Sequence, residues 1–353
     1  MSFSSKLEEW YAANGRTLPW RGIDDPYRIW LSEIILQQTR IEQGMSYYQH
    51  FIERYPTVYD LASASEEAVL KSWQGLGYYS RARNLHAAAR QIVEQYGGTF
   101  PNQYEAIRNL KGVGRYTAAA IASFAFRLPY PVIDGNVYRV ASRYFNIATP
   151  IGTDKAYTAF EEILVKVMDR QRPDIFNQAL MDFGSTYCKP TSPGCTECIF
   201  ADSCQAFRHG KVELLPVKNS PVKIRERYFY YIDILWNQGG TPMRMMHQRQ
   251  DNDIWKGLYE LPLIETTAPL DEAQQKQRVE EYLRPYSKEP PEHIELRMSA
   301  THKLTHQTLH ATFLVAKMRD IRLPKGSILQ PFSQKETKLL PVSRLIDKYL
   351  SQM

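Results

Sequence analysis

The sequence predicts a two-domain protein in which an all-helical domain is followed by an α/β domain. The chain has 353 residues, enough for two domains of ordinary size. Apolar residues recur at helical spacing through the first part, whereas later apolar runs have the length and composition of strands. Between the two patterns lies a segment with Pro216 and Pro221 followed by basic residues, which is typical of a linker. We therefore expect a helical domain at residues 1–213, a linker at 214–226 and an α/β domain at 227–353.

The helical pattern is clear at Ile29, Trp30 and Ile34, and again along residues 85–93. A glycine turn at residues 112–114 separates a short helical segment from an alanine-rich one. In the second domain we expect strands at residues 228–235, 243–247, 294–298 and 309–317, with helices near 271–283 and 341–350.

Composition narrows the class of protein. The longest apolar stretches are too short to span a membrane, so we expect a soluble protein with no membrane partner. A formal net charge of +6 allows nucleic-acid binding without arguing strongly for it. The sequence begins without a signal peptide, and its cysteines form one cluster, so we expect a reducing compartment.

The four cysteines of the chain form one compact run with a single Cys-x-x-Cys pair. Four thiolates suit either a structural zinc ion or a 4Fe-4S cluster, and prolines and a glycine between them allow the loop to bend inward. Zinc sites usually have two Cys-x-x-Cys pairs, so the spacing favours iron–sulfur over zinc. Two disulfides are a third, less favoured alternative. The predicted metal ligands are Cys188, Cys195, Cys198 and Cys204.

The glycine turn is the first candidate binding site. Two glycines one residue apart allow a tight turn whose N–H groups, with the start of the next helix, can bind a phosphate. Lys111 and Arg115 would add positive charge. A plain connector between helices is the alternative. The predicted DNA-phosphate contacts are Lys111, Gly112, Val113 and Gly114.

Five motifs in one order give the sequence a specific resemblance. The order of helix, Gly-Val-Gly hairpin, helix, aspartate and four-cysteine loop resembles the endonuclease III superfamily of helix-hairpin-helix DNA glycosylases. Within it, residues 1 to about 210 resemble the adenine-DNA glycosylases of the MutY type. The motifs are Leu-Pro-Trp-Arg at 18–21 and the runs at 30–39, 75–82, 110–118 and 132–137.

The resemblance implies excision of adenine, which requires protonation of the base and stabilisation of a cationic sugar. Glu33, on a largely apolar helix, could be held protonated by burial and act as the acid, while Asp134 stays ionised and faces the cation. By resemblance, Tyr116 and Asn136 steady these groups. The alternatives are that Glu33 is a solvated surface residue and that Asp134 is only a helix N-cap.

An adenine inside a duplex must be extruded before it can be excised. By resemblance, the pocket for the extruded base is lined by Trp20, Arg21, Leu36 and Gln178, and the residues that probe the duplex at the opposing base are Gln38, Thr39, Leu76 and Tyr78. Tyr78 could instead be an ordinary core residue. Bifunctional relatives, which also cut the strand, have a lysine where this chain has Tyr116, and a phenol cannot form a Schiff base. We therefore expect a monofunctional enzyme that leaves an abasic site.

The second domain has a looser resemblance to the Nudix-like C-terminal domain of the same glycosylases. Residues 255–262 are similar to the opening of a Nudix box, but the acidic core that would hold magnesium is missing. The family's Phe-Ser-His loop, which meets 8-oxoguanine, corresponds here to Leu304, Thr305 and His306, with two departures. His302, His306 and His310 could otherwise be ordinary strand and turn residues.

Taken together, the sequence predicts a monomeric DNA repair enzyme with a 4Fe-4S cluster that excises adenine opposite 8-oxoguanine in double-stranded DNA. The resemblance places it in the bacterial cytoplasm, associated with the nucleoid. Two alternatives stay open. One is a bifunctional endonuclease III-like glycosylase and lyase for oxidised pyrimidines, and the other is a non-catalytic iron–sulfur DNA-binding protein.

Overall fold

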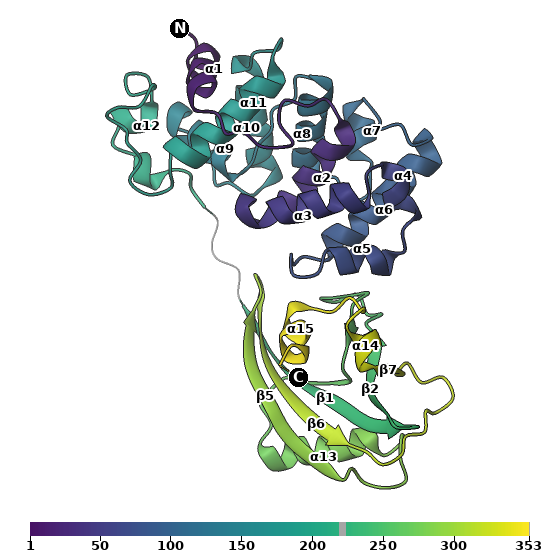
Figure 1. Cartoon of the computed structure of the whole chain (residues 1–353). Coiled ribbons are helices and arrows are strands. Elements are labelled where there is room, and N and C mark those ends of the chain that lie inside the picture. Colours follow the sequence, from purple (N-terminus) through teal and green to yellow (C-terminus); the bar gives the residue numbers. More distant parts are fainter. Residues whose placement is uncertain (219–223, 353) are drawn as a thin grey trace. The chain divides into compact units, whose positions relative to one another are not determined.

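The computed structural model describes residues 1–218 and 224–352, and the chain divides into two compact units (Figure 1). The first unit comprises Met1–Ser63 and Asn84–Ser220, and the second comprises Ala64–Arg83 and Pro221–Met353. The segment 64–83, which the sequence pattern placed in the helical domain, thus groups with the C-terminal residues. Of the predicted linker, residues 219–223 lie outside the described residues.

The described part of the first unit is built from helices, as predicted. No helix among the described residues of the chain is both long enough and apolar enough to cross a membrane. In chain order the helical elements are α1 (Phe3–Asn14), α2 (Pro26–Leu36), α3 (Ile41–Arg54), α4 (Val58–Ser63), α6 (Ser80–Tyr96, which begins in the second unit), α7 (Tyr104–Arg108), α8 (Arg115–Phe126), α9 (Gly135–Phe145), α10 (Asp154–Val167), α11 (Pro173–Asp182), the π-helical turn η1 (Phe183–Tyr187), α12 (Gln205–Arg208) and the 3-10 turn η2 (Val212–Leu214).

Helix α2 shows how the sequence determines where a helix begins and why it is buried. The Asp25 side chain caps its N-terminus by accepting hydrogen bonds from the backbone N–H groups of Tyr27 and Arg28, and Pro26 occupies the first turn. Most of its side chains are buried, and it packs against α3 and the alanine-rich α8. A helix that is apolar on nearly all sides must be surrounded by others, which is why α2 lies inside this unit.

A second part of the core joins α1, α9, α10 and α11. Phe3 of α1 stacks on Phe200 near the cysteines, and Phe160 and Phe176 are fully buried in the same cluster. This cluster fixes the start of α9 against α11 and places the cysteine loop beside them.

The second unit contains a mixed β-sheet with helices on both faces. Its long strands β1, β6 and β5 lie side by side (Figure 1); β1 and β6 are parallel, while β5 and β6 are antiparallel. The strand order is β3-β2-β1-β6-β5, with β4 also paired to β1 and β7 to β2. The elements are α5 (Glu66–Ser72), β1 (Arg225–Gln238), β2 (Thr241–Gln248), β3 (Tyr259–Glu260), β4 (Leu263–Thr266), α13 (Glu272–Leu283), β5 (His293–Lys303), β6 (Gln307–Lys317), β7 (Gln330–Ser333), α14 (Gln334–Thr337) and α15 (Arg344–Leu350).

The side chains of β1 point alternately to the two faces of this sheet. Phe229 and Tyr231 pack in one core cluster with residues of α15, whereas Tyr230 and Ile232 pack in another with Val279 and other residues of α13. Successive side chains of a strand point to opposite faces, so one apolar run serves both cores. The four predicted strands and both predicted helices of this domain are present, with shifted ends. The short β3, β4, β7 and α14 were not predicted.

Candidate active site

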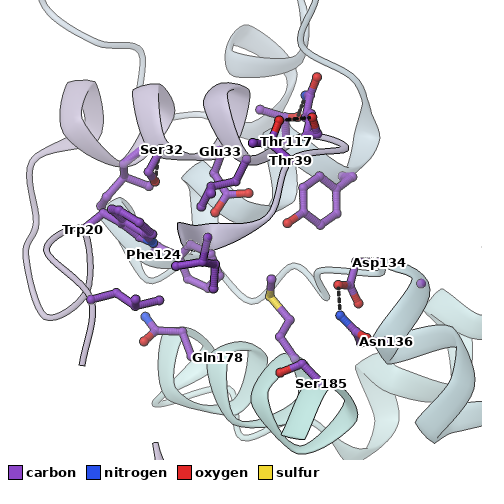
Figure 2. A pocket seen from close by; sticks show the side chains of 18 of the residues that line it. Trp20, Ser32, Glu33, Thr39, Thr117, Phe124, Asp134, Asn136, Gln178 and Ser185 are labelled. Atoms are coloured by element: carbon purple, nitrogen blue, oxygen red, sulfur yellow. Dashed lines mark hydrogen bonds between the residues drawn. The ribbon is translucent and has the colours of Figure 1, made fainter. Parts of the chain in front are cut away.

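A pocket of about 750 Å³ lies within the first unit (Figure 2). Its walls come from the loop before α2, from α2 and the turn after it, and from α8, the start of α9 and α11. Its volume is in the usual range for sites that enclose a small molecule. The structure brings together in its lining these predicted residues: Trp20, Arg21, Glu33, Leu36, Gln38, Thr39, Gly112, Gly114, Tyr116, Asp134, Asn136 and Gln178.

Glu33 is buried in this lining and only 8 % exposed, so the alternative of a solvated surface glutamate is wrong. Burial raises the pKa of Glu33 to about 7, and the negative charge of Asp134 acts in the same direction. A hydrogen bond from the Tyr116 hydroxyl and the charge of Arg21 oppose the rise. The pKa of Tyr116 lies well above its usual value because of burial and the nearby carboxyl groups, so this phenol keeps its proton and donates a hydrogen bond to Glu33. A sizeable fraction of Glu33 therefore stays protonated at neutral pH.

Asp134 faces the same pocket in a different environment. It is the N-cap of α9: its Oδ1 accepts from the backbone N–H of Val137 at 2.7 Å, and its Oδ2 accepts from Asn136 Nδ2 at 2.8 Å. Burial raises the pKa of Asp134 above its usual value, while these donors and the Arg139 charge counteract that rise. The N-cap alternative is thus correct as structure, and the same carboxylate also lines the pocket. Figure 2 shows Asp134 and Asn136 on one side and Glu33 on another.

Hydrogen bonds continue from Asp134 toward the cysteines. Asn136 Oδ1 accepts from an Arg139 Nη at 2.8 Å, and the same nitrogen donates to the Gly184 carbonyl at 2.6 Å. Arg139 Nε donates to the Cys188 carbonyl at 2.8 Å. The side chains that orient Asp134 are therefore bonded to the backbone at the first cysteine.

Asp182 is fully buried, is bonded to two arginines that line the pocket, and was not predicted from the sequence. It accepts two hydrogen bonds from Arg21, at 2.6 and 2.8 Å, and further ones from the side chain and backbone of Arg16. Burial alone would raise the pKa of Asp182, but the arginine hydrogen bonds outweigh it and hold the pKa below its usual range. Arg21 is thereby held at the pocket wall. The only sequence signal was spacing, because Asp182 follows the predicted Gln178 by one helical turn.

The turn after α2 holds two predicted residues, and the first of them has an unusual backbone conformation. Gln38 has a φ of +57°, in the left-handed region that residues other than glycine seldom adopt. Before it, Gln37 Nε2 donates to Thr117 Oγ1 of α8 at 3.2 Å, which ties the turn to α8. Both Gln38 and Thr39 line the same pocket.

The glycine hairpin requires glycine at its first glycine position, and its contact with DNA phosphate stays a prediction. Gly112 has a φ of +74°, and a side chain there would meet Asn84 at 2.5 Å, so only glycine fits. Gly114 is the N-cap of α8 and offers no side-chain cap. Lys111 is exposed, whereas Val113 is buried and presents only its backbone.

All four cysteines are free and line one pocket near η1 and α12. Its wall includes Phe183, Phe200 and Phe207. Arg143 donates to the Cys188 sulfur at 3.4 Å, and the Phe200 N–H donates to the Cys198 sulfur at the same distance. Burial raises the pKa of the Cys198 thiol to about 11. No group of three or more histidine, cysteine, aspartate or glutamate residues in the described chain has the arrangement of a preformed metal site.

In the second unit the predicted lesion-reading residues lie in the turn that joins β5 and β6. Thr305 and His306 are exposed, while Leu304 is partly buried against the core. The Tyr78 hydroxyl, in the loop before α6, forms a hydrogen bond with the Thr305 hydroxyl. Tyr78 is 48 % exposed and is not a core residue, whereas Leu76 is buried.

Comparison with known proteins assigns both parts of the chain. Residues 31–166 match the family model described as HhH-GPD superfamily base excision DNA repair protein, and residues 234–352 match the NUDIX domain model. The solved structure of a thermostable thymine-DNA glycosylase has a TM-score of 0.55 and 30 % identity, and the match covers 59 % of this chain and 95 % of that one. A trapped endonuclease III–DNA intermediate, at 22 % identity and a TM-score of 0.52, shares the fold over 59 % of this chain and 94 % of its own. The fold and the pocket thus define a base excision repair protein of the HhH-GPD superfamily.

Comparison with curated relatives identifies the branch of this superfamily. Adenine DNA glycosylase of Buchnera aphidicola subsp. Baizongia pistaciae is 35 % identical over 265 residues, which covers 74 % of this chain and 73 % of the relative. The mouse adenine DNA glycosylase is 35 % identical over 80 % of this chain and 64 % of its own length, and the human one is 40 % identical over 62 % and 42 %. The chain belongs to the adenine DNA glycosylase family.

Proposed function

We propose that this protein excises adenine opposite 8-oxoguanine in double-stranded DNA and leaves an abasic site. The observation that carries the proposal is the pairing of two carboxyl groups in one pocket, with Glu33 protonated near neutral pH and Asp134 fixed by donors at a helix N-terminus. Surroundings that keep one carboxyl group protonated and the other ionised suit one acid and one charged stabiliser. The positive end of the α9 dipole also favours the ionised form of Asp134.

The proposed reaction follows from these two states. Glu33 gives its proton to a ring nitrogen of the extruded adenine, and the electron pair of the glycosidic bond leaves with the base. The sugar becomes an oxocarbenium-like cation, which the Asp134 carboxylate stabilises until water adds to it and loses a proton. Tyr116 cannot form an imine with the abasic sugar, which supports a monofunctional reaction.

The four cysteines fit a 4Fe-4S cluster by their chemistry. They are four free thiols around one pocket, with an apolar wall and with N–H donors directed at two of the sulfurs. Cys188, Cys195, Cys198 and Cys204 would hold the cluster, which would supply a covalent cross-link for a loop with little regular structure. The cytoplasmic location and monomeric state expected from the sequence are part of the same proposal.

Recognition of 8-oxoguanine is assigned to the second unit. The exposed Thr305 and His306 offer a hydroxyl and an imidazole at the tip of a β-hairpin, and Tyr78 joins them through its bond to Thr305. Backbone bonds from Leu304 to Gln307 and from Arg225 to His306 hold this turn. Preorganised polar groups of this kind suit the reading of a base edge.

The reaction is tested by Glu33→Gln, which keeps the shape of the side chain and the acceptor for Tyr116 but removes the acidic proton. Single-turnover assays on an 8-oxoguanine:adenine duplex should show a loss of excision of about a hundredfold or more, with duplex affinity retained. Glu94→Gln, on an exposed part of α6, is the matched control. Excision by Glu33→Gln at close to the unmodified rate would remove Glu33 from the acid role and this proposal with it.

The metal centre is tested by purification under anaerobic conditions. We expect a brown protein with broad visible absorbance and about four iron atoms per chain. Replacement of Cys198 by serine should remove the colour. A colourless protein that contains stoichiometric zinc would show that the cysteines hold zinc instead.

A further inference from the structure

Tyr11 lies outside the pocket, yet it is bonded to a residue that lines it. Its hydroxyl, on α1, is 2.8 Å from Oε1 of Gln178, on α11. Gln178 lines the pocket and is 8 % exposed (Figure 2). The same hydroxyl is 3.4 Å from an Nη of Arg21.

The direction of these hydrogen bonds follows from what each group can do. Arginine is always a donor, so the Tyr11 oxygen accepts from Arg21. The single hydroxyl proton is then left for Gln178, whose Oε1 must accept it. Burial raises the pKa of Tyr11, so the phenol keeps this proton at neutral pH. Because Oε1 is engaged, the Nε2 amide is the group that Gln178 offers to the pocket.

Arg21 and the Tyr11 ring are themselves fixed in place by their neighbours. Arg21 is bonded to Asp182 through two nitrogens and to the Arg16 carbonyl at 3.1 Å, so it cannot turn to reverse the pattern. A side chain at Gly15 would meet the Tyr11 ring at 2.7 Å, so glycine at this position leaves room for the ring. Helices α1 and α11 pack directly together.

We propose that Tyr11 is a positioning residue that fixes the Gln178 amide as a hydrogen-bond donor toward the extruded base. The inference rests on the proposed function and adds a selection rule to it. The pocket presents an N–H group at this point, so it pairs with an acceptor such as a purine ring nitrogen and disfavours a base that places a donor there.

Two glutamine variants test the donor assignment. Gln178→Glu keeps the shape and the acceptor for Tyr11 but has no N–H, and Gln178→Met removes both polar atoms. Both should lower single-turnover excision of adenine to a similar degree, roughly three- to tenfold or more for a hydrogen bond to the base. Retention of the unmodified rate by Gln178→Glu would show that Gln178 acts as an acceptor and would overturn the inference.

A double-mutant cycle tests whether Tyr11 acts through Gln178. Tyr11→Phe should lower excision roughly three- to tenfold in the unmodified chain and have no further effect in the Gln178→Met background. Tyr59→Phe, which removes a hydroxyl bonded to the Gly97 carbonyl away from the pocket, is the control and should leave excision unchanged. If the losses from Tyr11→Phe and Gln178→Met multiply, Tyr11 has only a structural role and the inference fails.

The same double-mutant cycle can be measured without catalysis. The affinity of each protein is determined for a duplex whose target deoxyadenosine carries a 2′-fluorine that blocks excision. An unmodified protein that excises no adenine would contradict the proposed function, while coupling in affinity would still support the Tyr11 assignment. An active protein with multiplicative losses in both measurements would contradict the Tyr11 assignment alone.

Discussion

At the scale of single residues, the site depends on giving two similar carboxyl groups different surroundings. Glu33 accepts a hydrogen bond from one phenol deep in the pocket, whereas Asp134 accepts from a backbone N–H and an amide at the start of a helix. Each donor to a carboxylate favours its ionised form, and burial without donors favours the neutral form. The proposed acid and the proposed charged stabiliser are thus distinguished by what surrounds them.

This difference predicts how excision depends on pH. The acid must be protonated, and the pKa of Glu33 is raised to about 7, so the single-turnover rate should fall about tenfold per pH unit well above that value. At the acid end the rate should fall when Asp134 becomes protonated, at a pH above the usual aspartate range because its pKa is raised. Rates measured from pH 4 to 9 on one duplex check this profile, with binding followed in parallel. A rate that stays flat between about pH 7 and pH 9 would contradict it.

At the scale of secondary-structure elements, α9 connects the pocket to the cysteine loop. Its N-terminus carries Asp134, and one face further along carries Arg139 and Arg143. Arg143 is 3 % exposed and donates to the carbonyl groups of Lys189, Pro190, Val212 and Leu215 as well as to the Cys188 sulfur. One guanidinium therefore satisfies backbone carbonyl groups just after the first cysteine and beyond the last one, which a loop without regular structure cannot do for itself.

Arg143→Lys should consequently destabilise the protein although it keeps the charge. A lysine ammonium has three donors on one atom and cannot reach four carbonyl groups spread around a planar fork, so buried acceptors lose their partners. We expect a loss of about 2 kcal/mol in the free energy of unfolding, measured by chemical denaturation of the whole chain. Arg90→Lys, at an exposed ion pair of 3.8 Å, is the matched control and should change stability little. Equal stability of the two variants would show that the Arg143 bonds contribute nothing measurable.

At the scale of the whole molecule, the two units are expected to divide the work between them. The excision pocket and the cysteines belong to the first unit, and the β5–β6 turn with Tyr78 belongs to the second. Discrimination of the opposing base should therefore be separable from the chemistry of excision.

Replacing Thr305 and His306 together by alanine tests this separation. Each contact to the base is worth roughly 1 to 3 kcal/mol, so affinity and excision should fall much more for 8-oxoguanine:adenine than for guanine:adenine. Glu33 and Asp134 are untouched by the change, so slow excision from guanine:adenine should persist. Ser299→Ala with Thr301→Ala, further along β5, is a control in the same strand. Equal losses on both duplexes would mean that the turn supports folding or general DNA binding instead.

A feature of the fold or the site could be predicted from the sequence when neighbouring residues carried its pattern. Glu33 and Asp134 lie in motifs with fixed spacing, and the long strands have clear apolar runs. Asp182 and Tyr11 lie in none of the motifs, and the helical spacing of Asp182 from Gln178 does not reveal its role, because the roles of both residues arise from partners 166 and 167 positions away. The bond between Tyr78 and Thr305 joins positions 227 apart, and the grouping of residues 64–83 with the C-terminal part likewise depends on distant contacts. Strands as short as β3 contain too few residues for a period to show.

The dual position of Asp134, as a helix cap and as a pocket carboxylate, has a consequence for how cells would handle defective copies. Asp134→Ala removes a cap worth about 1 kcal/mol, and this loss opposes the stability gained by removing a carboxylate whose pKa is raised on folding. Glu33→Gln also removes a carboxyl group whose pKa is raised on folding, but it removes no helix cap. The pKa of Glu33 rises from 4.5 to about 7 on folding, so ionising it lowers stability progressively as pH rises through that interval, by up to about 3 kcal/mol, and glutamine avoids this loss. Two equally inactive variants would therefore differ in stability, and the more stable Glu33→Gln chain would accumulate and occupy lesions that a working copy needs to reach.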